Sequence, residues 1–271
     1  MTSHDVVSRC RRVFGQRRVG HAGTLDPDAT GVLLVGLGQA TRLLRFLSPL
    51  PKSYTGEVAL GVATSTLDAA GAVVGRWDMA AVTPEQVAAA AARFVGEIEQ
   101  APPMVSAVKV GGKRLHELAR AGVEVERAAR RVTVYRFDVA PTGADPLVYS
   151  LAVECSTGTY VRTLAADLGT ALGGGAHLRA LRRTVIGPFD APVPLDAVTA
   201  GDVLPPAAAL PSFARVVADG DLAVAVGHGR VMPRAAFGGD GPWAVVGVDG
   251  RLLAVYEPHT GETAKPAVVL T

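Results

Sequence analysis

Residues 20–31 read Gly-His-Ala-Gly-Thr-Leu-Asp-Pro-Asp-Ala-Thr-Gly, and residues 32–38 continue as Val-Leu-Leu-Val-Gly-Leu-Gly. The first part is a polar loop with glycines and two acids. The second part is an apolar run typical of a strand that is buried on both faces. We therefore expect a buried strand over 32–38, with an acidic side chain held rigidly in the loop directly before it.

Asp26 is the acid of interest because Pro27 follows it. Proline favours an extended backbone at Asp26 and removes the next N–H donor, so the carboxylate is less used for capping its own turn. The alternative is an ordinary turn in which Asp26 and Asp28 cap the local backbone. Partners for Asp26 elsewhere in the chain would decide between the two interpretations.

Composition indicates an ordinary globular protein with one large domain and one small one: 271 residues, 49% hydrophobic and 19% charged. No apolar run is long enough for a membrane span, and Met1–Asp5 lacks the apolar core of a signal peptide. The two cysteines, Cys10 and Cys155, suggest neither a disulfide framework nor a thiolate zinc site. We expect a cytoplasmic protein. The histidines are scattered, and no metal site is expected.

The net charge is only +2, but the basic residues are clustered. One cluster lies near the start (Arg9 to Arg18), one between Lys109 and Arg131, and one at Arg179, Arg182 and Arg183. Three separated basic clusters favour a phosphate-binding surface. The alternative is three solvated faces that bind nothing.

Capping residues and periodicity predict the main elements. Thr83, Pro84 and Gln86 open a helix that we expect to run to Val95 and to stop at Gly96. Alternating patterns predict strands over 54–60 and 147–155. A second helix, starting near Thr159, carries an apolar stripe and ends at Gly173–Gly175.

The last third of the chain has a different composition. Prolines cluster from 187 to 211, which indicates a linker or covering segment. Beyond it, short strands and turns predict a small β-rich domain, with a hairpin over 243–256 and a type I′ turn at Asp249-Gly250.

Two further residues could give Asp26 a chemical role. Arg162 falls in the first turn of the second helix, where a cation opposes the helix dipole, so a nearby carboxylate or phosphate would explain it. The alternative is an arginine that faces solvent. An arginine can keep an aspartate ionised, and an ionised aspartate can act as a nucleophile. Tyr54 can stack on a flat ring. Together these residues suit cofactor-free chemistry on a base of RNA.

Five motifs occur in order along the chain: Gly20–Gly31, Lys52–Tyr54, Pro102–Gly112, Gly158–Gly169 and Ala176–Arg183. In this order they resemble the motifs of the TruB family of bacterial tRNA pseudouridine synthases. Gly20–Gly31 resembles the family's catalytic motif, and Lys52-Ser53-Tyr54 its tyrosine motif. The other three are Pro102–Gly112, Gly158–Gly169 and Ala176–Arg183, which resemble the start of an RNA-gripping insertion, an arginine motif and a leucine motif. The chain begins inside the family's opening motif, without its Lys-Pro portion.

The resemblance implies an α+β fold. It comprises a mixed-sheet pseudouridine synthase catalytic domain over 1–212 and a small β-rich, PUA-like, RNA-contacting domain over 213–271. The insertion would span about 101–131, and the linker 187–211.

The resemblance also implies the roles of individual residues. The catalytic residues would be Asp26, Tyr54 as the base-stacking tyrosine, and Arg162 as the ion-pair partner of Asp26. Residues expected to bind substrate are His21, Leu181, Lys109, Arg182 and Arg183.

The implied reaction converts uridine 55 in the T loop of tRNA to pseudouridine without any cofactor. The expected partner is tRNA, through its T arm, with no membrane and no obligatory protein partner, and the chain is expected to be a monomer. Asp26 would attack either C1′ of the sugar or C6 of the base.

Two other functions compete with this one. A non-catalytic RNA-binding or tRNA-folding protein would explain the basic clusters but needs no ordered set of Asp, Tyr and Arg. A glycoside hydrolase could use Asp26 and Asp28 as paired carboxylates. The closeness of the two acids in sequence and the lack of tryptophans nearby argue against it.

Overall fold

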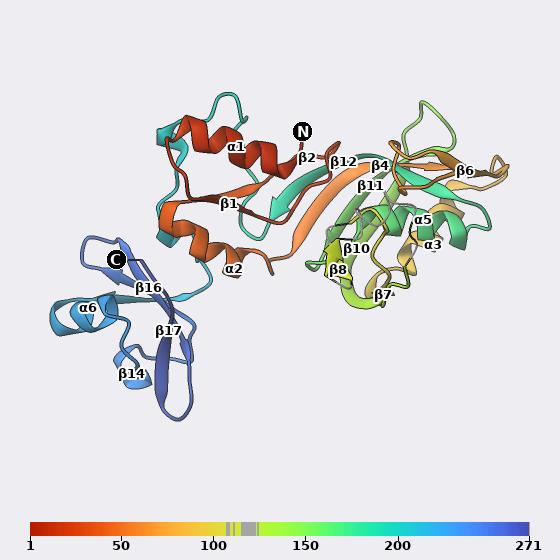
Figure 1. Ribbon diagram of the computed structural model, residues 1–271. Coiled ribbons are helices and arrows are strands. Elements are labelled where there is room, and N and C mark those ends of the chain that lie inside the picture. The colour runs from red at the N-terminus through yellow and green to blue at the C-terminus, as the bar shows by residue number, and fades with distance from the viewer. Residues whose placement is uncertain (107–108, 111, 115–122, 124, 271) are drawn as a thin grey trace. The chain divides into compact units, whose positions relative to one another are not determined.

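The computed structural model describes the chain except residues 107–108, 111, 115–122, 124 and 271 (Figure 1). By their contacts, the residues form two compact units. The first unit comprises residues 1–25, 33–48 and 192–271, and the second comprises residues 26–32 and 49–191. This grouping by contacts differs from the expected domain boundary at 212/213. That boundary was drawn by the functions expected of the two parts, and it stays a prediction.

A six-stranded mixed sheet forms the centre of the second unit, in the order β2-β12-β4-β11-β10-β7. Only β2 and β12 run parallel; the other neighbours are antiparallel. The strands are β2 (Thr30–Gly31), β4 (Lys52–Leu60), β7 (Gly96–Gln100), β10 (Arg130–Pro141), β11 (Val148–Cys155) and β12 (Ala176–Ile186). Two small antiparallel pairs complete the unit's strands: β5 (Val62–Thr64) with β6 (Val73–Arg76), and β8 (Lys109–Val110) with β9 (Lys113–Arg114).

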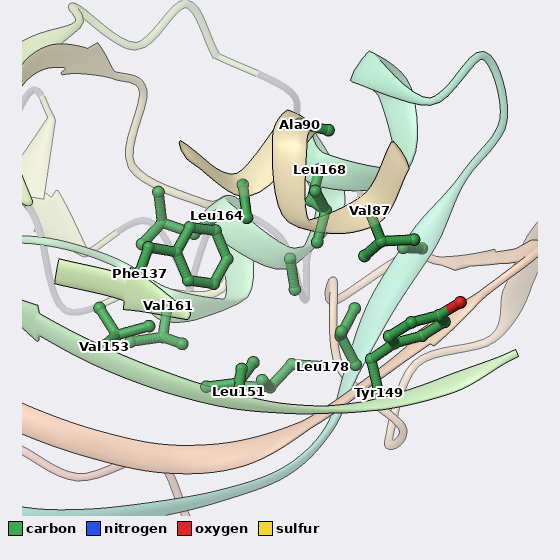
Figure 2. Close-up of a cluster of buried hydrophobic side chains, with 14 of the residues drawn as sticks. Val87, Ala90, Phe137, Tyr149, Leu151, Val153, Val161, Leu164, Leu168 and Leu178 are labelled. Atoms are coloured by element: carbon green, nitrogen blue, oxygen red, sulfur yellow. The ribbon is translucent and has the colours of Figure 1, made fainter. Parts of the chain in front are cut away.

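Helices α3 (Pro84–Ala92) and α5 (Val161–Ala171) lie along one face of this sheet (Figure 1). Figure 2 shows Leu164 and Leu168 of α5 in one buried cluster with Leu151 of the sheet. The expected strands over 54–60 and 147–155 are confirmed. Their alternating apolar residues face this core, because successive side chains of a strand point to opposite faces.

Helix α3 also begins as expected. The Thr83 hydroxyl accepts from the N–H of Gln86, and the Gln86 side chain accepts from the N–H of Thr83, so both halves of the capping box are present. The helix ends at Ala92, three residues before the predicted Val95, and Phe94 instead packs on the core.

The described part of the first unit contains three helices, a two-stranded ribbon and a five-stranded sheet. Its helices are α1 (Ser3–Val13), α2 (Leu44–Leu47) and α6 (Gly220–Gly227), with short 3₁₀ turns η1 (Gly38–Leu43), η2 (Ala200–Asp202), η3 (Pro206–Ala209) and η4 (Arg234–Ala236). The ribbon pairs β1 (Val19–Ala22) with β3 (Leu34–Leu37). The sheet has the order β13-β15-β16-β17-β14, from Ala214–Ala218, Trp243–Gly247, Leu252–Pro258, Thr263–Val269 and Met232–Pro233.

The tail sheet shares a core with residues from elsewhere in the first unit. Leu43 of η1 and Leu210 of the proline-rich segment are buried against Ala244, Val246 and other residues of the sheet. The proline-rich segment therefore covers one side of the tail sheet. This agrees with the covering role, one of the two roles expected for it.

The strand predicted over 32–38 is wrong in length and in burial. Only Leu34–Leu37 is a strand, it pairs with β1 alone, and three of its four residues are half-buried. A two-stranded ribbon has no neighbouring sheet to cover both faces. Val35 and Leu37 instead pack beside α1.

The hairpin over 243–256 is confirmed, but its predicted type I′ turn is wrong. A type I′ turn needs a positive φ at both central residues. Leu67 is the only non-glycine with positive φ in the described part of the chain, so Asp249 does not meet that need. The N–H of Gly250 (φ +78°) donates to Gly247 O, and the N–H of Gly247 donates to Arg251 O. This is a three-residue connection with a glycine bulge.

Gly31 lies where the loop that carries Asp26 meets the sheet. Its φ is +101°, and a Cβ there would stand 2.0 Å from the carbonyl oxygen of Arg183 in β12. The adjoining Val32 N–H donates to that same oxygen at 2.9 Å. Only glycine permits both this backbone conformation and this close approach.

We predict that Gly31→Ala lowers the free energy of unfolding by about 2–4 kcal/mol, the sum of a left-handed backbone and a steric overlap. Gly143→Ala is the matched control, because Gly143 has φ +81° with nothing within 4 Å. It carries the backbone cost alone, about 1–2 kcal/mol. Urea unfolding measures both variants, and equal losses would contradict the steric argument.

Candidate active site

Arg162 is the second residue of α5, and a buried amide fixes the start of that helix. No side chain caps the helix at Tyr160. Instead, the side chain of Gln100, at the end of β7, accepts from the Tyr160 N–H at 2.7 Å and donates to the Tyr160 carbonyl at 3.1 Å. Gln100 is 3% exposed. This pair ties the helix start to the sheet and so fixes the Arg162 backbone.

The Arg162 guanidinium holds Asp26 through two of its nitrogens. Nε lies 2.8 Å from Oδ2 of Asp26, and Nη2 donates to Oδ1 at 2.9 Å. Nη2 also donates to the carbonyl of Val105 at 2.9 Å. Nη1 donates to the carbonyl of Thr66 at 3.1 Å and to Oδ2 of Asp68 at 3.3 Å. These contacts use the full donor set of a guanidinium.

These contacts resolve the open question about a cation in the first turn of a helix. The Arg162 side chain is only 5% exposed, so it does not face solvent. Two carboxylates, Asp26 and Asp68, compensate its charge and the unfavourable helix dipole. Both carboxylate oxygens of Asp26 contact Arg162, so the side chain does not cap its own turn. The backbone carbonyl of Asp26 does close a local turn, because it accepts from the Ala29 N–H at 3.0 Å.

Asp68 is a site residue that the sequence reasoning missed. It lies in the loop after β5, next to Leu67, whose φ is +63°. The Asp68 carboxylate accepts hydrogen bonds from the Thr66 hydroxyl and, at 3.2 Å, from the Ala70 N–H. The signal available was a short polar loop, Ser65 to Asp68, which contains one acid.

A cleft of about 180 Å³ opens beside the Asp26–Arg162 pair. Its lining includes Leu181, together with residues of the Asp26 loop, the Asp68 loop and β12. The structure therefore brings Asp26, Arg162 and Leu181 to one cleft. Tyr54 is 9% exposed on β4 and is not among the described residues that line it.

Tyr54 lies in a buried polar group that also contains Arg183 and Lys52. Burial raises the pKa of the Tyr54 phenol, while the nearby Arg183 guanidinium, which hydrogen-bonds the phenol, opposes that shift. Burial and the charge of Arg183 lower the pKa of Lys52 to about 8. Burial also lowers the pKa of Arg183 itself. Tyr54 is therefore a neutral phenol at neutral pH.

The remaining expected binding residues have different surroundings. Arg182 is exposed on β12, and its Nη1 donates to the Thr30 hydroxyl at 3.4 Å. Arg183, its neighbour, is 1% exposed. His21 is half-buried on β1 of the first unit, opposite Val35. Lys109 lies in β8, and its side chain is outside the described part of the structure.

Within the residues that the structure describes, no three or more His, Cys, Asp or Glu side chains gather as metal ligands would. None of the helices in that same part of the chain has the length and apolar character needed to cross a membrane.

The electrostatics of Asp26 are a balance of opposing effects. Burial is the largest, and it raises the pKa of the carboxyl above its ordinary value. The charge of Arg162 and its hydrogen bond lower that pKa, whereas the charges of Asp68 and Asp28 raise it. Because the side chain is still 40% exposed, one part of the carboxylate remains open to the cleft. A carboxylate with an elevated pKa is more basic and more nucleophilic than one in water.

We predict opposite shifts when the two neighbours of Asp26 are neutralised. Arg162→Met removes the favourable charge and raises the pKa of Asp26 further, whereas Asp68→Asn removes a repulsive charge and lowers it. Carbon-13 NMR titration of the Asp26 carboxyl measures both. A shift in the same direction in both variants would contradict this balance. Because the folded-state pKa is raised, the contribution of Asp26 to stability is largest at low pH and is lost as pH rises through that value.

Comparisons with known proteins identify the family of the chain. A sequence profile described as "TruB family pseudouridylate synthase (N terminal domain)" matches residues 11–161, and one described as "tRNA pseudouridylate synthase B C-terminal domain" matches residues 162–206. The structure of an H/ACA ribonucleoprotein bound to a substrate RNA containing 2′-deoxyuridine includes a chain with the same fold. The TM-score is 0.72 at 22% identity, covering all of this chain and 82% of that one.

Curated relatives match over most of their length. A protein of Mycobacterium sp. (strain KMS) named tRNA pseudouridine synthase B is 49% identical over 277 residues, covering 100% of this chain and 92% of the relative. One of Symbiobacterium thermophilum with the same name is 52% identical over 236 residues, covering 84% and 78%. The first profile matches more than half of the chain, and the Mycobacterium relative matches all of it. The chain therefore belongs to the TruB family of tRNA pseudouridine synthases.

Proposed function

We propose that this tRNA pseudouridine synthase isomerises uridine 55 in the T loop of tRNA, with Asp26 as its nucleophile. The single observation that carries the proposal is the Asp26 carboxylate, gripped at both oxygens by Arg162 and still 40% exposed beside a cleft. At about 180 Å³, the cleft is smaller than the roughly 300–1,000 Å³ of pockets for drug-sized ligands. That size suits one extruded base.

The reaction needs one bond to break and another to form at the same sugar carbon. The N1–C1′ bond of uridine breaks, the uracil turns, and C5 bonds to C1′. Asp26 assists by attacking either C1′ or C6 and is released when the product forms. The proton on C5 leaves to Tyr54 or to a group that Tyr54 orients, and N1 gains a proton, so no atom is lost overall.

The target uridine must first leave its stack in the folded loop. We propose that Leu181, at the cleft wall, packs against the extruded base, and that Tyr54 stacks on it once the base has entered. In the same proposal, His21 fills space in the T-arm loop, and Arg182 and Lys109 contact phosphates. The exposure of Arg182 supports its part.

The proposal extends to the setting of the enzyme. In this proposal the enzyme acts on tRNA as a monomer, with no obligatory protein partner. In the same proposal the steps above use only side chains of this protein and no cofactor. Residues 1–212 would carry the chemistry, the tail 213–271 would contact RNA as a PUA-like domain, and the cytoplasm, where tRNA is processed, would be the place of action.

Asp26→Asn tests the nucleophile. The amide keeps the size of the side chain but cannot act as the nucleophile, so we expect turnover to disappear while tRNA binding persists. Release of tritium from tRNA labelled at uracil C5 measures turnover, and filter binding measures affinity. Asp28→Asn is the control, because Asp28 is an exposed acid in the same loop, and we expect it to keep most of the activity.

The same assay separates the competing functions. A normal rate in Asp26→Asn would refute the nucleophile assignment. Binding and refolding of tRNA by the wild type without any tritium release would instead support the non-catalytic RNA-binding protein. Replacement of uridine 55 by cytidine in the transcript should abolish release, and persistent release would place the reaction at another uridine.

A further inference from the structure

Arg183 joins the two segments that carry the proposed catalytic residues Asp26 and Tyr54. Its Nε donates to the carbonyl of Val32 at 2.8 Å, and its own carbonyl accepts from the Val32 N–H at 2.9 Å. The same strand position pairs with Gly31 on one side and with Tyr54 on the other. Arg183 therefore contacts the end of the Asp26 loop and the Tyr54 strand at once.

The Arg183 side chain is directed inward, unlike that of its neighbour. Successive residues of a strand face opposite sides of the sheet. Arg182 pairs with Thr55, and both are exposed; Arg183 pairs with Tyr54, and both are buried, at 1% and 9% exposure. Side chains of directly opposite residues lie about 4.5–5.5 Å apart at Cβ. A guanidinium at this position reaches the phenol and is shielded from a phosphate in solvent.

The Arg183–Tyr54 contact has a defined chemical meaning. A guanidinium has only donors, so in their hydrogen bond the phenol oxygen of Tyr54 is the acceptor. The phenol's own proton must then point elsewhere. The other charged groups that affect the pKa of the phenol are Asp26 and Cys155. Arg183 and Cys155 in turn affect the pKa of Lys52.

We propose that Arg183 is a positioning residue that fixes the phenol of Tyr54 and ties its strand to the Asp26 loop, rather than a ligand of RNA phosphate. The proposal rests on the proposed roles of Asp26 and Tyr54. It assigns the two adjacent arginines of β12 to different tasks, Arg182 to the substrate and Arg183 to the geometry of the site.

A double-mutant cycle tests the proposal. The variants are Arg183→Gln, Tyr54→Phe and the double variant, and the readout is the single-turnover rate of tritium release with enzyme in excess. We expect Arg183→Gln to lower the rate about 100-fold, the cost of misplacing reactive groups by about 1 Å. In the Tyr54→Phe background the same change should cost much less, because the phenol through which Arg183 acts is already absent.

Binding distinguishes this role from a phosphate contact, and titration distinguishes it from a merely structural role. We expect Arg183→Gln to leave the salt dependence of tRNA affinity unchanged, whereas loss of a phosphate contact would reduce the slope by about 0.9. Ultraviolet titration, with Tyr54→Phe subtracted, should show tyrosinate at Tyr54 forming at higher pH in Arg183→Gln, because a cation that favours the anion has gone.

Controls keep the outcome clear. Arg136→Gln removes an exposed arginine of β10 that pairs with Asp138, and it should change neither the rate nor the titration. If Arg183→Gln does not fold, Arg183→Lys, alone and with Tyr54→Phe, provides the same cycle. Equal rate losses in both backgrounds, or a reduced salt slope, would overturn the proposal. An active wild type with an inactive Asp26→Asn and a normal Arg183→Gln would overturn this inference alone.

Discussion

The ion pair between Arg162 and Asp26 is the interaction on which the site depends. A guanidinium at 5% exposure has lost nearly all contact with water, a loss that costs several kcal/mol unless every donor finds a partner. Here the partners come from three loops, at Asp26, Thr66 to Asp68, and Val105. One side chain thus organises three segments that have no regular structure of their own, and the sheet contributes by fixing the helix on which it sits.

Much of the second unit could be predicted from the sequence because its signals are local. Thr83 and Gln86 mark a helix start within four residues, and the alternation along 147–155 marks the face of a strand. The prediction for 32–38 failed because an apolar run is the same whether a strand lies inside a sheet or in a two-stranded ribbon. The turn at Asp249-Gly250 was misjudged for a related reason, since the loop length that selects the turn type is set by strand pairing.

The site itself was predictable only in part. Asp26 and Arg162 had motifs around them, and the resemblance to the family implied their pairing, whereas the residues alone left a solvent-facing Arg162 open. Asp68 and Gln100 act through tertiary contacts across long stretches of sequence, so composition and spacing say nothing about them. Arg182 and Arg183 are identical in type and adjacent in sequence. Which of the two side chains is buried depends on how β12 pairs with β4, and this register cannot be read from the sequence.

The division of the chain gives the acid an unusual covalent setting. Residues 26–32 belong to the second unit, but the residues immediately before and after them, 1–25 and 33–48, belong to the first. Asp26 thus lies in a seven-residue segment of the second unit, and the residues on both sides of this segment in the sequence belong to the first unit. A fragment covering 49–191 would retain Arg162, Tyr54 and nearly the whole central sheet, yet lack the carboxylate. A contiguous fragment that keeps Asp26 together with Arg162 must therefore also contain residues 33–48, which belong to the first unit.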